Sequence, residues 1–235
     1  MITKFSEKER NRWADEGWLS SNSYYNFWGN IFSKDLDQYI RNKEVVDIGT
    51  GNGLVWENTL NKGANPSHLT MIDPDLSISE KLAGRDFISP HRSTIENVEE
   101  IIGDTIIFKQ AFHLVYEKSG DRLFDLVKGK NFISFAMFPE IDWPVSDAFK
   151  EVHAPSCPDA RKIIEKNGKK IIESKLYSYP VTMNREEWIS MIEGRFISCL
   201  YACDDGFIEN EVSWIQDNCP DIVEFKDTLE CLIFR

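Results

Sequence analysis

The sequence has no apolar run approaching the roughly 18 residues needed to cross a lipid bilayer. Its first stretch, residues 1–13, is charged and polar, without the apolar segment of a signal peptide. Cysteine is scarce: five are scattered over the last third of the chain, at Cys157, Cys199, Cys203, Cys219 and Cys231. We therefore expect free thiols rather than disulfides, and a cytoplasmic protein with no membrane partner.

Positive charge is also in short supply. The chain carries 27 Lys and Arg against 39 Asp and Glu, a net charge of −12. A nucleic-acid-binding protein needs a basic surface to neutralise phosphates, so no nucleic-acid partner is expected. No Cys/His set has zinc-ligand spacing, and we expect no metal. Acids at Asp204, Asp205, Glu209 and Glu211 are interpreted as a solvated helix start.

What the sequence does contain is an alternation of short apolar strands with helices, typical of a parallel, helix-covered sheet. The pattern predicts a doubly wound, Rossmann-like α/β fold with seven strands, mainly parallel, an antiparallel last strand, and helices on both faces. Strands are expected at 45–48, 69–72, 87–89, 105–108, 131–137, 170–177 and 225–234. Helices are expected at 7–16, 23–39, 55–62, 78–83, 117–126, 185–193 and 206–217.

The most informative segment is a glycine-rich turn after the first expected strand. Asp47 precedes three glycines at alternate positions, Gly49, Gly51 and Gly53, and a helix follows. Glycines let the backbone pass close to a ligand, and the helix start offers free N–H groups. Asp73 ends the next strand, where a carboxylate can accept hydrogen bonds from ribose hydroxyls. Turn and acid together indicate a ribose-bearing cofactor.

The glycine spacing separates this site from a dinucleotide site, which usually has the pattern G-x-G-x-x-G. Here the pattern D-x-G-x-G-x-G resembles the first motif of class I S-adenosylmethionine-dependent methyltransferases. Further segments resemble a small-molecule branch that includes trans-aconitate methyltransferase-like proteins. They are residues 110–113 (Gln-Ala-Phe-His), 128–131 (Lys-Gly-Lys-Asn, in place of a Lys-Pro-Gly-Gly turn), 179–182 and 185–188.

The resemblance implies S-adenosyl-L-methionine as cofactor, with the glycine loop around its methionine part and Asp73 at its ribose. It departs from the family after the third strand, where an expected acid is missing and Ser93 and Thr94, with Glu96, are the nearest match. The implied cofactor-binding residues are Asp47, Gly49, Thr50, Gly51, Gly53, Asp73, Pro74, Ser93, Thr94 and Gln110.

Two residues at the end of the fourth strand are the candidates for chemistry. His113 is positioned to act as a general base if the acceptor arrives protonated, and the alternative is a packing role. Lys109 stands where the family usually has a small or polar residue. It either binds an anionic substrate or pairs with an acid such as Asp47 or Asp104.

Substrate contacts are expected outside the glycine loop. Residues 1–40 are expected to form an N-terminal helical lid, in which Tyr24 and Trp28 either close over the substrate or pack on the sheet. A cofactor-binding domain at 41–235 is expected to carry a substrate cap from about 140–169 and 184–220. Trp143, His153 and Arg195 lie there, and Arg195 is either a carboxylate clamp or a surface residue.

These observations predict methyl transfer to a small molecule, with O-methylation of a carboxylate or hydroxyl favoured and N- or C-methylation as alternatives. A nucleic-acid methyltransferase is disfavoured, because its [NDS]-P-P-[YFW] signature is absent. A silent Rossmann-like partner module is disfavoured by the intact glycine turn, and a nicotinamide-dependent oxidoreductase by the glycine spacing. The sequence does not indicate an oligomeric state.

Overall fold

The computed structural model describes residues 17–98, 101–156 and 159–235, so the helix predicted at 7–16 lies outside the described residues. The chain forms two compact units, each built from three segments. The sheet unit comprises Tyr25–Met137, Pro158–Tyr177 and Leu229–Arg235. The helical unit comprises Met1–Tyr24, Phe138–Cys157 and Ser178–Thr228. This division differs from the expected boundary at residue 40. Whether residues 1–40 act as a lid and residues 140–169 and 184–220 as a cap stays a prediction.

The described residues form one seven-stranded sheet with the order β3-β2-β1-β4-β5-β7-β6. The strands β1 to β5 pair in parallel, and β7 runs antiparallel to β5. The predicted mainly parallel sheet with an antiparallel last strand is confirmed. The strands are β1 (Glu44–Ile48), β2 (His68–Ile72), β3 (Ile88–His91), β4 (Ile101–Lys109), β5 (Val127–Met137), β6 (Ile171–Asn184) and β7 (Ile222–Phe234).

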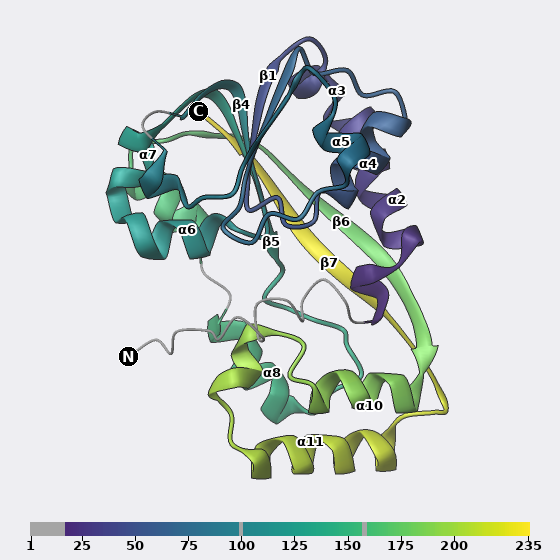
Figure 1. The fold of residues 1–235 in the computed structure, drawn as a ribbon. Helices are drawn as coiled ribbons and strands as arrows, with labels where there is room; N and C mark the ends of the chain where they lie inside the picture. The colour runs from purple at the N-terminus through teal and green to yellow at the C-terminus, as the bar shows by residue number, and fades with distance from the viewer. Residues whose placement is uncertain (1–16, 99–100, 157–158) are drawn as a thin grey trace. The chain divides into compact units, whose positions relative to one another are not determined.

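Helices cover both faces of the strands in the sheet unit, as predicted. Helices α4 and α5 lie on one face, and α6 and α7 on the other (Figure 1). The helical elements assigned mainly to this unit are α2 (Asn22–Asn30), η3 (Ile31–Asp35, a π-helical turn), α3 (Asp37–Ile40), α4 (Leu54–Asn61), α5 (Glu80–Ala83), η4 (Ile95–Asn97), α6 (Phe112–Ser119), η5 (Gly120–Arg122), α7 (Leu123–Leu126) and α9 (Ala160–Lys166).

Strands β4 and β5 each begin four residues earlier than the sequence predicts. Residues 128–131, expected to form a turn, lie inside β5, and β4 begins at Ile101 rather than Thr105. The reason is that Gly103 faces Gly129 in the parallel β4–β5 pair. A Cβ on Gly129 would lie 2.5 Å from Ile106, so glycine permits the strands to pack closely where it would otherwise signal a turn.

Two predicted helices are interrupted. The helix expected at 23–39 divides into α2, η3 and α3. The helix expected at 117–126 begins earlier, at Phe112, and breaks at Gly120, whose φ is +58°. Because α6 starts at Phe112, His113 lies in the first turn of a helix instead of in a connecting loop.

Large aromatic side chains fill the space between the sheet and the helices on the α4 face. Trp28 from α2 packs edge-on against Phe135 of β5, with ring centroids 4.8 Å apart. Phe32 stacks on Trp56 of α4 at 5.4 Å. Both tryptophans are fully buried. Such pairs contribute roughly 0.5–1.5 kcal/mol each beyond burial of their area, so these contacts fix α2 and α4 on the sheet beside the end of β1.

The helical unit has a separate aromatic core. Five rings pack around one another there, with centroid separations between 5.2 and 6.2 Å: Trp18, Trp143, Trp188, Phe196 and Phe225. Its helical elements are η2 (Gly17–Ser20), α8 (Asp147–Ser156), α10 (Arg185–Glu193), η6 (Ser198–Ala202) and α11 (Asp205–Asn218). The helices predicted at 185–193 and 206–217 correspond to α10 and α11.

The acidic cluster at α11 is only partly the solvated helix start that the sequence suggests. The carboxylate of Asp204 accepts a hydrogen bond from the backbone N–H of Phe207 at 2.8 Å and so caps the helix, as predicted. Glu211, however, is only 2% exposed. It accepts hydrogen bonds from the backbone N–H of Ser146, at 2.8 Å, and from the Ser146 hydroxyl, and thereby fixes the start of α8.

Cys203, Cys219 and Cys231 are free thiols, in agreement with the prediction, and Cys157 lies outside the described residues. Within the described part of the chain, no group of His, Cys, Asp and Glu side chains has the arrangement of a metal site. No described helix combines the length and apolar character that a membrane span requires.

Candidate functional site

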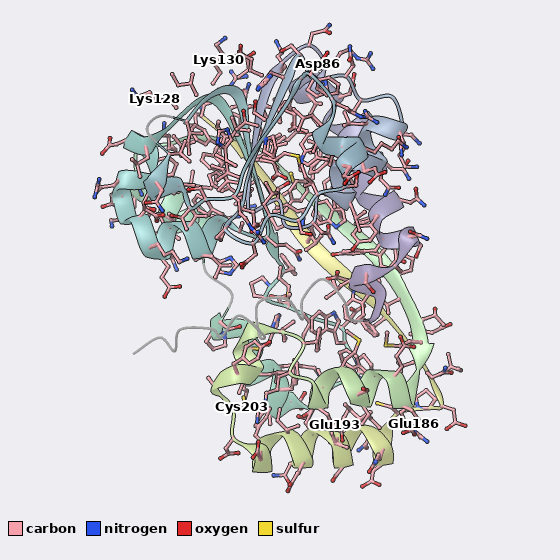
Figure 2. All side chains as sticks on the ribbon, viewed as in Figure 1. Asp86, Lys128, Lys130, Glu186, Glu193 and Cys203 are labelled. Atoms are coloured by element: carbon pink, nitrogen blue, oxygen red, sulfur yellow. The ribbon has the colours of Figure 1, made fainter. Side chains whose placement is uncertain are left out.

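The predicted site residues gather where the parallel strands end. Asp86, just before β3, and Lys128 and Lys130, near the start of β5, mark the opposite, amino-terminal edge of these strands (Figure 2). At the carboxyl edge, β1 lies between β2 and β4, so the connections leaving β1 and β4 go to opposite faces. Ligands in open α/β sheets bind at such a switch point.

The loop between β1 and α4 turns on its three glycines. Gly49, Gly51 and Gly53 have φ values of +80°, +64° and +71°, in the region that favours glycine. The N–H of Gly49 donates to the carbonyl oxygen of Ile72 at 2.8 Å, which ties the loop to the end of β2.

The three glycines are needed for different reasons, and this corrects the expectation that all three make room for a ligand. A Cβ on Gly49 would lie 2.3 Å from Cβ of Ala111, and one on Gly53 would lie 2.6 Å from Ile78. The protein's own atoms occupy both positions. A Cβ on Gly51 would meet no described atom within 4 Å. Gly51 alone therefore presents bare backbone to open space.

Asp73 joins three strand ends. Its Oδ2 accepts a hydrogen bond from the N–H of Gly51 at 2.9 Å, and its Oδ1 accepts one from the N–H of Asp75 at 2.8 Å. Its carbonyl oxygen accepts a hydrogen bond from the N–H of Ser93, after β3, at 3.2 Å. Pro74 follows and is exposed. Each carboxylate oxygen keeps capacity for a second donor, so Asp73 can both order the glycine loop and bind a ligand hydroxyl.

Ser93 and Thr94, the nearest match to the acid that the resemblance places after the third strand, lie next to Asp73 in space. The Ser93 hydroxyl donates to the carbonyl oxygen of Thr94 at 3.1 Å, and the Thr94 hydroxyl accepts from Asn97 at 3.2 Å. Glu96 accepts a hydrogen bond from Ser119, at the end of α6, at 3.0 Å, and the Thr94 side chain also bonds to it. The Glu96 carboxylate is thus engaged within the protein, while Ser93 and Thr94 are the polar residues beside the Asp73 backbone.

Asp47 is a buried acid at the start of the glycine loop. Its Oδ2 accepts a hydrogen bond from the indole N–H of Trp56 at 2.8 Å, and the residue is 1% exposed. The buried side chain of Thr50 also bonds to this carboxylate. Burial raises the pKa of Asp47, while the bond from Thr50, the charge of Lys109 and the bond from Trp56 oppose the rise. Asp47 and Thr50 therefore place a buried carboxylate and a buried hydroxyl together at the loop.

Lys109 ends β4 and supplies the positive charge at this edge. Its Nζ lies 5.7 Å from the centre of the Trp28 ring. Burial lowers the pKa of Lys109, and the nearby carboxylates of Asp47 and Asp73 oppose that change. The alternative partner, Asp104, is bound instead by Lys130 at 2.6 Å. Trp28 is 1% exposed, so it packs between helix and sheet and presents its ring to Lys109.

Gln110 comes directly after Lys109, and His113 lies three residues further along the chain. Gln110 has a φ of +57°, an unfavourable conformation for a residue with a side chain, and its N–H donates to the carbonyl oxygen of Phe135 at 3.0 Å. Strain of this kind clusters at functional sites. Burial lowers the pKa of His113, so its imidazole favours the neutral form that a general base requires.

One contact at the loop carries no distinctive sequence signal. The side-chain amide of Asn52, between Gly51 and Gly53, donates to the hydroxyl of Tyr25 at 3.3 Å, and its oxygen accepts from the N–H of Leu54 at 3.1 Å. Tyr25 belongs to the aromatic segment proposed as a lid, where Tyr24 and Trp28 received the substrate role. The structure thus adds Tyr25 and Asn52 to the residues that shape the loop.

The remaining predicted substrate residues lie in the helical unit, and their polar groups are engaged there. The Tyr24 hydroxyl donates to Asp227 at 3.0 Å, and the Trp143 indole N–H donates to the carbonyl oxygen of Lys226 at 3.2 Å. The Arg195 guanidinium donates to the carbonyl oxygens of Leu200 and Cys203, at 2.7 and 2.5 Å, and to Asp205. His153 is buried beside Trp143, with ring centres 5.5 Å apart. Their substrate role stays a prediction.

The residues present fit the cofactor that the sequence suggests. Gly51 offers bare backbone, Asp73 offers acceptors for hydroxyl groups, and Lys109 offers a cation for a carboxylate. Asp47 and Thr50 supply buried polar atoms at the same loop. An amino-acid tail attached to a ribose presents the groups that complement this set.

Solved structures share this architecture. A cyclopropane-fatty-acyl-phospholipid synthase-like protein from Lactobacillus casei is 9% identical, with a TM-score of 0.59 and coverage of 97% of this chain and 93% of that one. A candidate methyltransferase from an antibiotic biosynthesis pathway of Anabaena variabilis is 10% identical, with a TM-score of 0.52 and coverage of 86% and 96%. Coclaurine N-methyltransferase, crystallised with S-adenosylhomocysteine, is 14% identical, with a TM-score of 0.47 and coverage of 94% and 74%.

No protein-family model and no curated protein matches the sequence. At these identities the likeness to the two structures with TM-scores above 0.5 establishes the fold alone, which agrees with the strand order observed here. This chain has the Rossmann-like fold of those structures.

Proposed function

We propose that this chain is an S-adenosylmethionine-dependent methyltransferase that acts on a small molecule. One observation carries the proposal. The carboxylate of Asp73 is hydrogen-bonded to the N–H of Gly51, the one loop glycine whose missing side chain leaves open space. The carboxylate of Asp73, which would bind the sugar, and the exposed backbone of Gly51 thus lie together at the switch point of the sheet. Proteins of this fold class bind their ligands there.

Different residues of the site would bind different parts of the cofactor. Asp73 would accept hydrogen bonds from the two ribose hydroxyls, and Ser93 and Thr94 would contact the adenine. Gly51 would lie along the methionine part, whose ammonium group suits the buried carboxylate of Asp47. The Lys109 ammonium suits a carboxylate, either that of the methionine tail or one on the acceptor. Gln110 would hold the turn between Lys109 and His113.

The bound cofactor supplies a methyl group already activated by its sulfonium sulfur. The protein then has to align the acceptor and exclude water, and alignment alone lowers a barrier by roughly 7–11 kcal/mol. His113 accepts the acceptor's proton if that acceptor is a hydroxyl or an ammonium. Burial keeps this imidazole neutral, so its free nitrogen lone pair is available. A carboxylate acceptor needs no base, and His113 then shapes the pocket.

The net charge of the chain and the charge of Lys109 favour one class of methyl acceptor. The net charge of −12 repels polyanions, which favours a small molecule over RNA or DNA. Lys109 is a cation at the site and favours an acceptor bearing a carboxylate, so we propose O-methylation of a carboxylate or hydroxyl, with N- or C-methylation as the alternative. Relationship to the trans-aconitate methyltransferase-like branch, a cytoplasmic location, and a lid and cap over the site belong to the same proposal.

The rival function is a Rossmann-like partner module that binds no cofactor. A module of that kind would not require the side chains of Asp73, Asp47 and Thr50, or the missing side chain of Gly51. Isothermal titration with S-adenosylmethionine, S-adenosylhomocysteine and NAD separates the alternatives. We expect binding of the first two in the micromolar range and no binding of NAD. Heat of binding with NAD alone would indicate a nicotinamide enzyme, and no binding of any of the three would indicate the partner module.

A further inference from the structure

The indole of Trp56 holds the buried carboxylate of the glycine loop. Trp56 lies in α4, the helix that follows the loop, and is fully buried. Its N–H donates to Oδ2 of Asp47 at 2.8 Å, within the range of a bond to a charged acceptor. The side chain of Thr50 bonds to the same carboxylate. Two side-chain donors, one from the loop and one from the helix, therefore converge on Asp47.

Packing fixes the orientation of this indole. Phe32, in η3, stacks on the Trp56 ring, with centroids 5.4 Å apart and ring planes 21° apart. Phe32 also contacts Trp28, whose ring lies 5.7 Å from the Lys109 ammonium. Packing of this kind locks the rotamers on which a binding site depends. One aromatic cluster thus supports both the donor to Asp47 and the ring beside Lys109.

Burial works against the charge on Asp47. A carboxylate removed from water favours its neutral form unless hydrogen bonds or a nearby cation compensate. Burial accordingly raises the pKa of Asp47, and the charge of Asp73 adds to the rise. The bond from Thr50, the charge of Lys109 and the bond from Trp56 oppose it. Burial lowers the pKa of Lys109, and the Asp47 carboxylate opposes that fall, so the two charges support each other.

We propose that Trp56 is a positioning residue for the amino-acid tail of the cofactor and that it acts through Asp47. This inference rests on the proposed function. The tail carries one ammonium and one carboxylate, and the site offers the opposite charges on Asp47 and Lys109. The indole N–H keeps the Asp47 carboxylate charged and oriented. Loss of this donor therefore weakens binding of the tail and leaves the contacts of the nucleoside with Asp73 intact.

Titration calorimetry of the full chain with two probes tests the proposal. S-adenosylhomocysteine carries the nucleoside and the amino-acid tail, whereas 5′-methylthioadenosine carries the nucleoside without the tail. Trp56→Phe keeps an aromatic ring at this position and removes the donor. It should weaken S-adenosylhomocysteine binding by about tenfold or more, the loss expected for one hydrogen bond to a charged group. Binding of 5′-methylthioadenosine should not change.

The pH dependence of binding separates this role from a packing role. Without the indole donor the pKa of Asp47 rises further, so Trp56→Phe should lose S-adenosylhomocysteine at a higher pH than the wild type does. Thr50→Val removes the second donor and should act in the same direction, whereas Thr50→Ser keeps a hydroxyl and should behave as the wild type. Leu60→Ala is the matched control, because it removes buried apolar volume from α4 and no donor. It should leave the pH of loss unchanged.

A measurement without ligand keeps this proposal distinct from the proposed function. The carboxyl carbon signal that Asp47→Asn removes from the NMR spectrum should titrate at a higher pH in Trp56→Phe than in the wild type. An unchanged titration, or an equal effect of Trp56→Phe on the two probes, overturns the positioning role and leaves the proposed function standing. If the wild-type chain binds neither probe, the proposed function fails, and the positioning role fails with it.

Discussion

The N–H of Gly51 donates a hydrogen bond to the carboxylate of Asp73, 22 residues away, at 2.9 Å. This contact makes one carboxylate responsible both for the shape of the loop after β1 and for the acceptors that a ribose would meet. A structural role and a binding role therefore fall on the same side chain, and variants have to separate them.

Asp73→Ala should weaken S-adenosylmethionine binding by about 1–3 kcal/mol, because ligand hydroxyls lose their acceptor. Titration calorimetry measures the change. Asp75→Ala is the matched control: its side chain is removed two residues away, while its N–H remains. The ribose role is refuted by an unchanged affinity in the Asp73 variant.

The glycines of the loop should respond differently to alanine. Gly49→Ala places a Cβ 2.3 Å from that of Ala111 and should cost stability by about 2–5 kcal/mol through overpacking and an unfavourable φ. Gly51→Ala meets no described atom and should cost only about 1–2 kcal/mol of backbone strain, yet lose cofactor binding. Urea unfolding and calorimetry on both variants check this. If Gly51→Ala binds as the wild type does, the open space is not the cofactor's.

The sequence predicted the sheet, its antiparallel last strand and the loop residues, because backbone requirements leave local marks. Alternating apolar runs specify strands, and glycines at alternate positions specify a turn. It misjudged where glycines act in packing instead of turning, as in the Gly103–Gly129 pair. For Arg195 it left open a carboxylate clamp or a surface residue, since a residue's type does not reveal that its guanidinium donates to carbonyl oxygens of its own chain.

Substitutions of Arg195 test whether its hydrogen bonds stabilise the folded chain. Its guanidinium donates to Leu200, Cys203 and Asp205, and its own φ is +55°. Arg195→Ala should lower the free energy of unfolding by about 1–3 kcal/mol, because buried carbonyl oxygens lose donors. Arg195→Lys should recover little of this loss, since an ammonium cannot reproduce the planar fork. Urea unfolding without any ligand decides the matter, and wild-type stability in both variants would return Arg195 to the substrate role.

Asp227 in the helical unit is a buried acid, and Trp18 and Tyr24 donate to its Oδ2 at 3.2 and 3.0 Å. Burial raises the pKa of Asp227, so the folded state favours the protonated form. Its stabilising contribution is then present at low pH and is lost as pH rises through the folded-state pKa. Asp227→Asn keeps an acceptor without the charge. The melting temperature of this variant minus that of the wild type should therefore increase from pH 4 to pH 8.

The matched variant Asp227→Leu removes the oxygen to which Trp18 and Tyr24 donate. It should be less stable than Asp227→Asn by about 1–3 kcal/mol at every pH. A difference between Asn variant and wild type that does not change with pH would mean that Asp227 keeps an ordinary pKa.

His113 provides the test of proton transfer. If it is the general base, His113→Ala should bind S-adenosylmethionine normally and lose roughly 10²–10⁴-fold in turnover. The readout is release of S-adenosylhomocysteine with whichever member of a panel of phenols and carboxylic acids supports reaction. Burial lowers the pKa of His113, so the neutral base persists as pH falls, and the acidic limb of the rate profile should lie below the ordinary histidine value of about 6.5. A carboxylic acid acceptor should show no such limb from His113, because no proton has to leave it. Full turnover of a phenol by His113→Ala would leave the side chain a packing role against the end of β4.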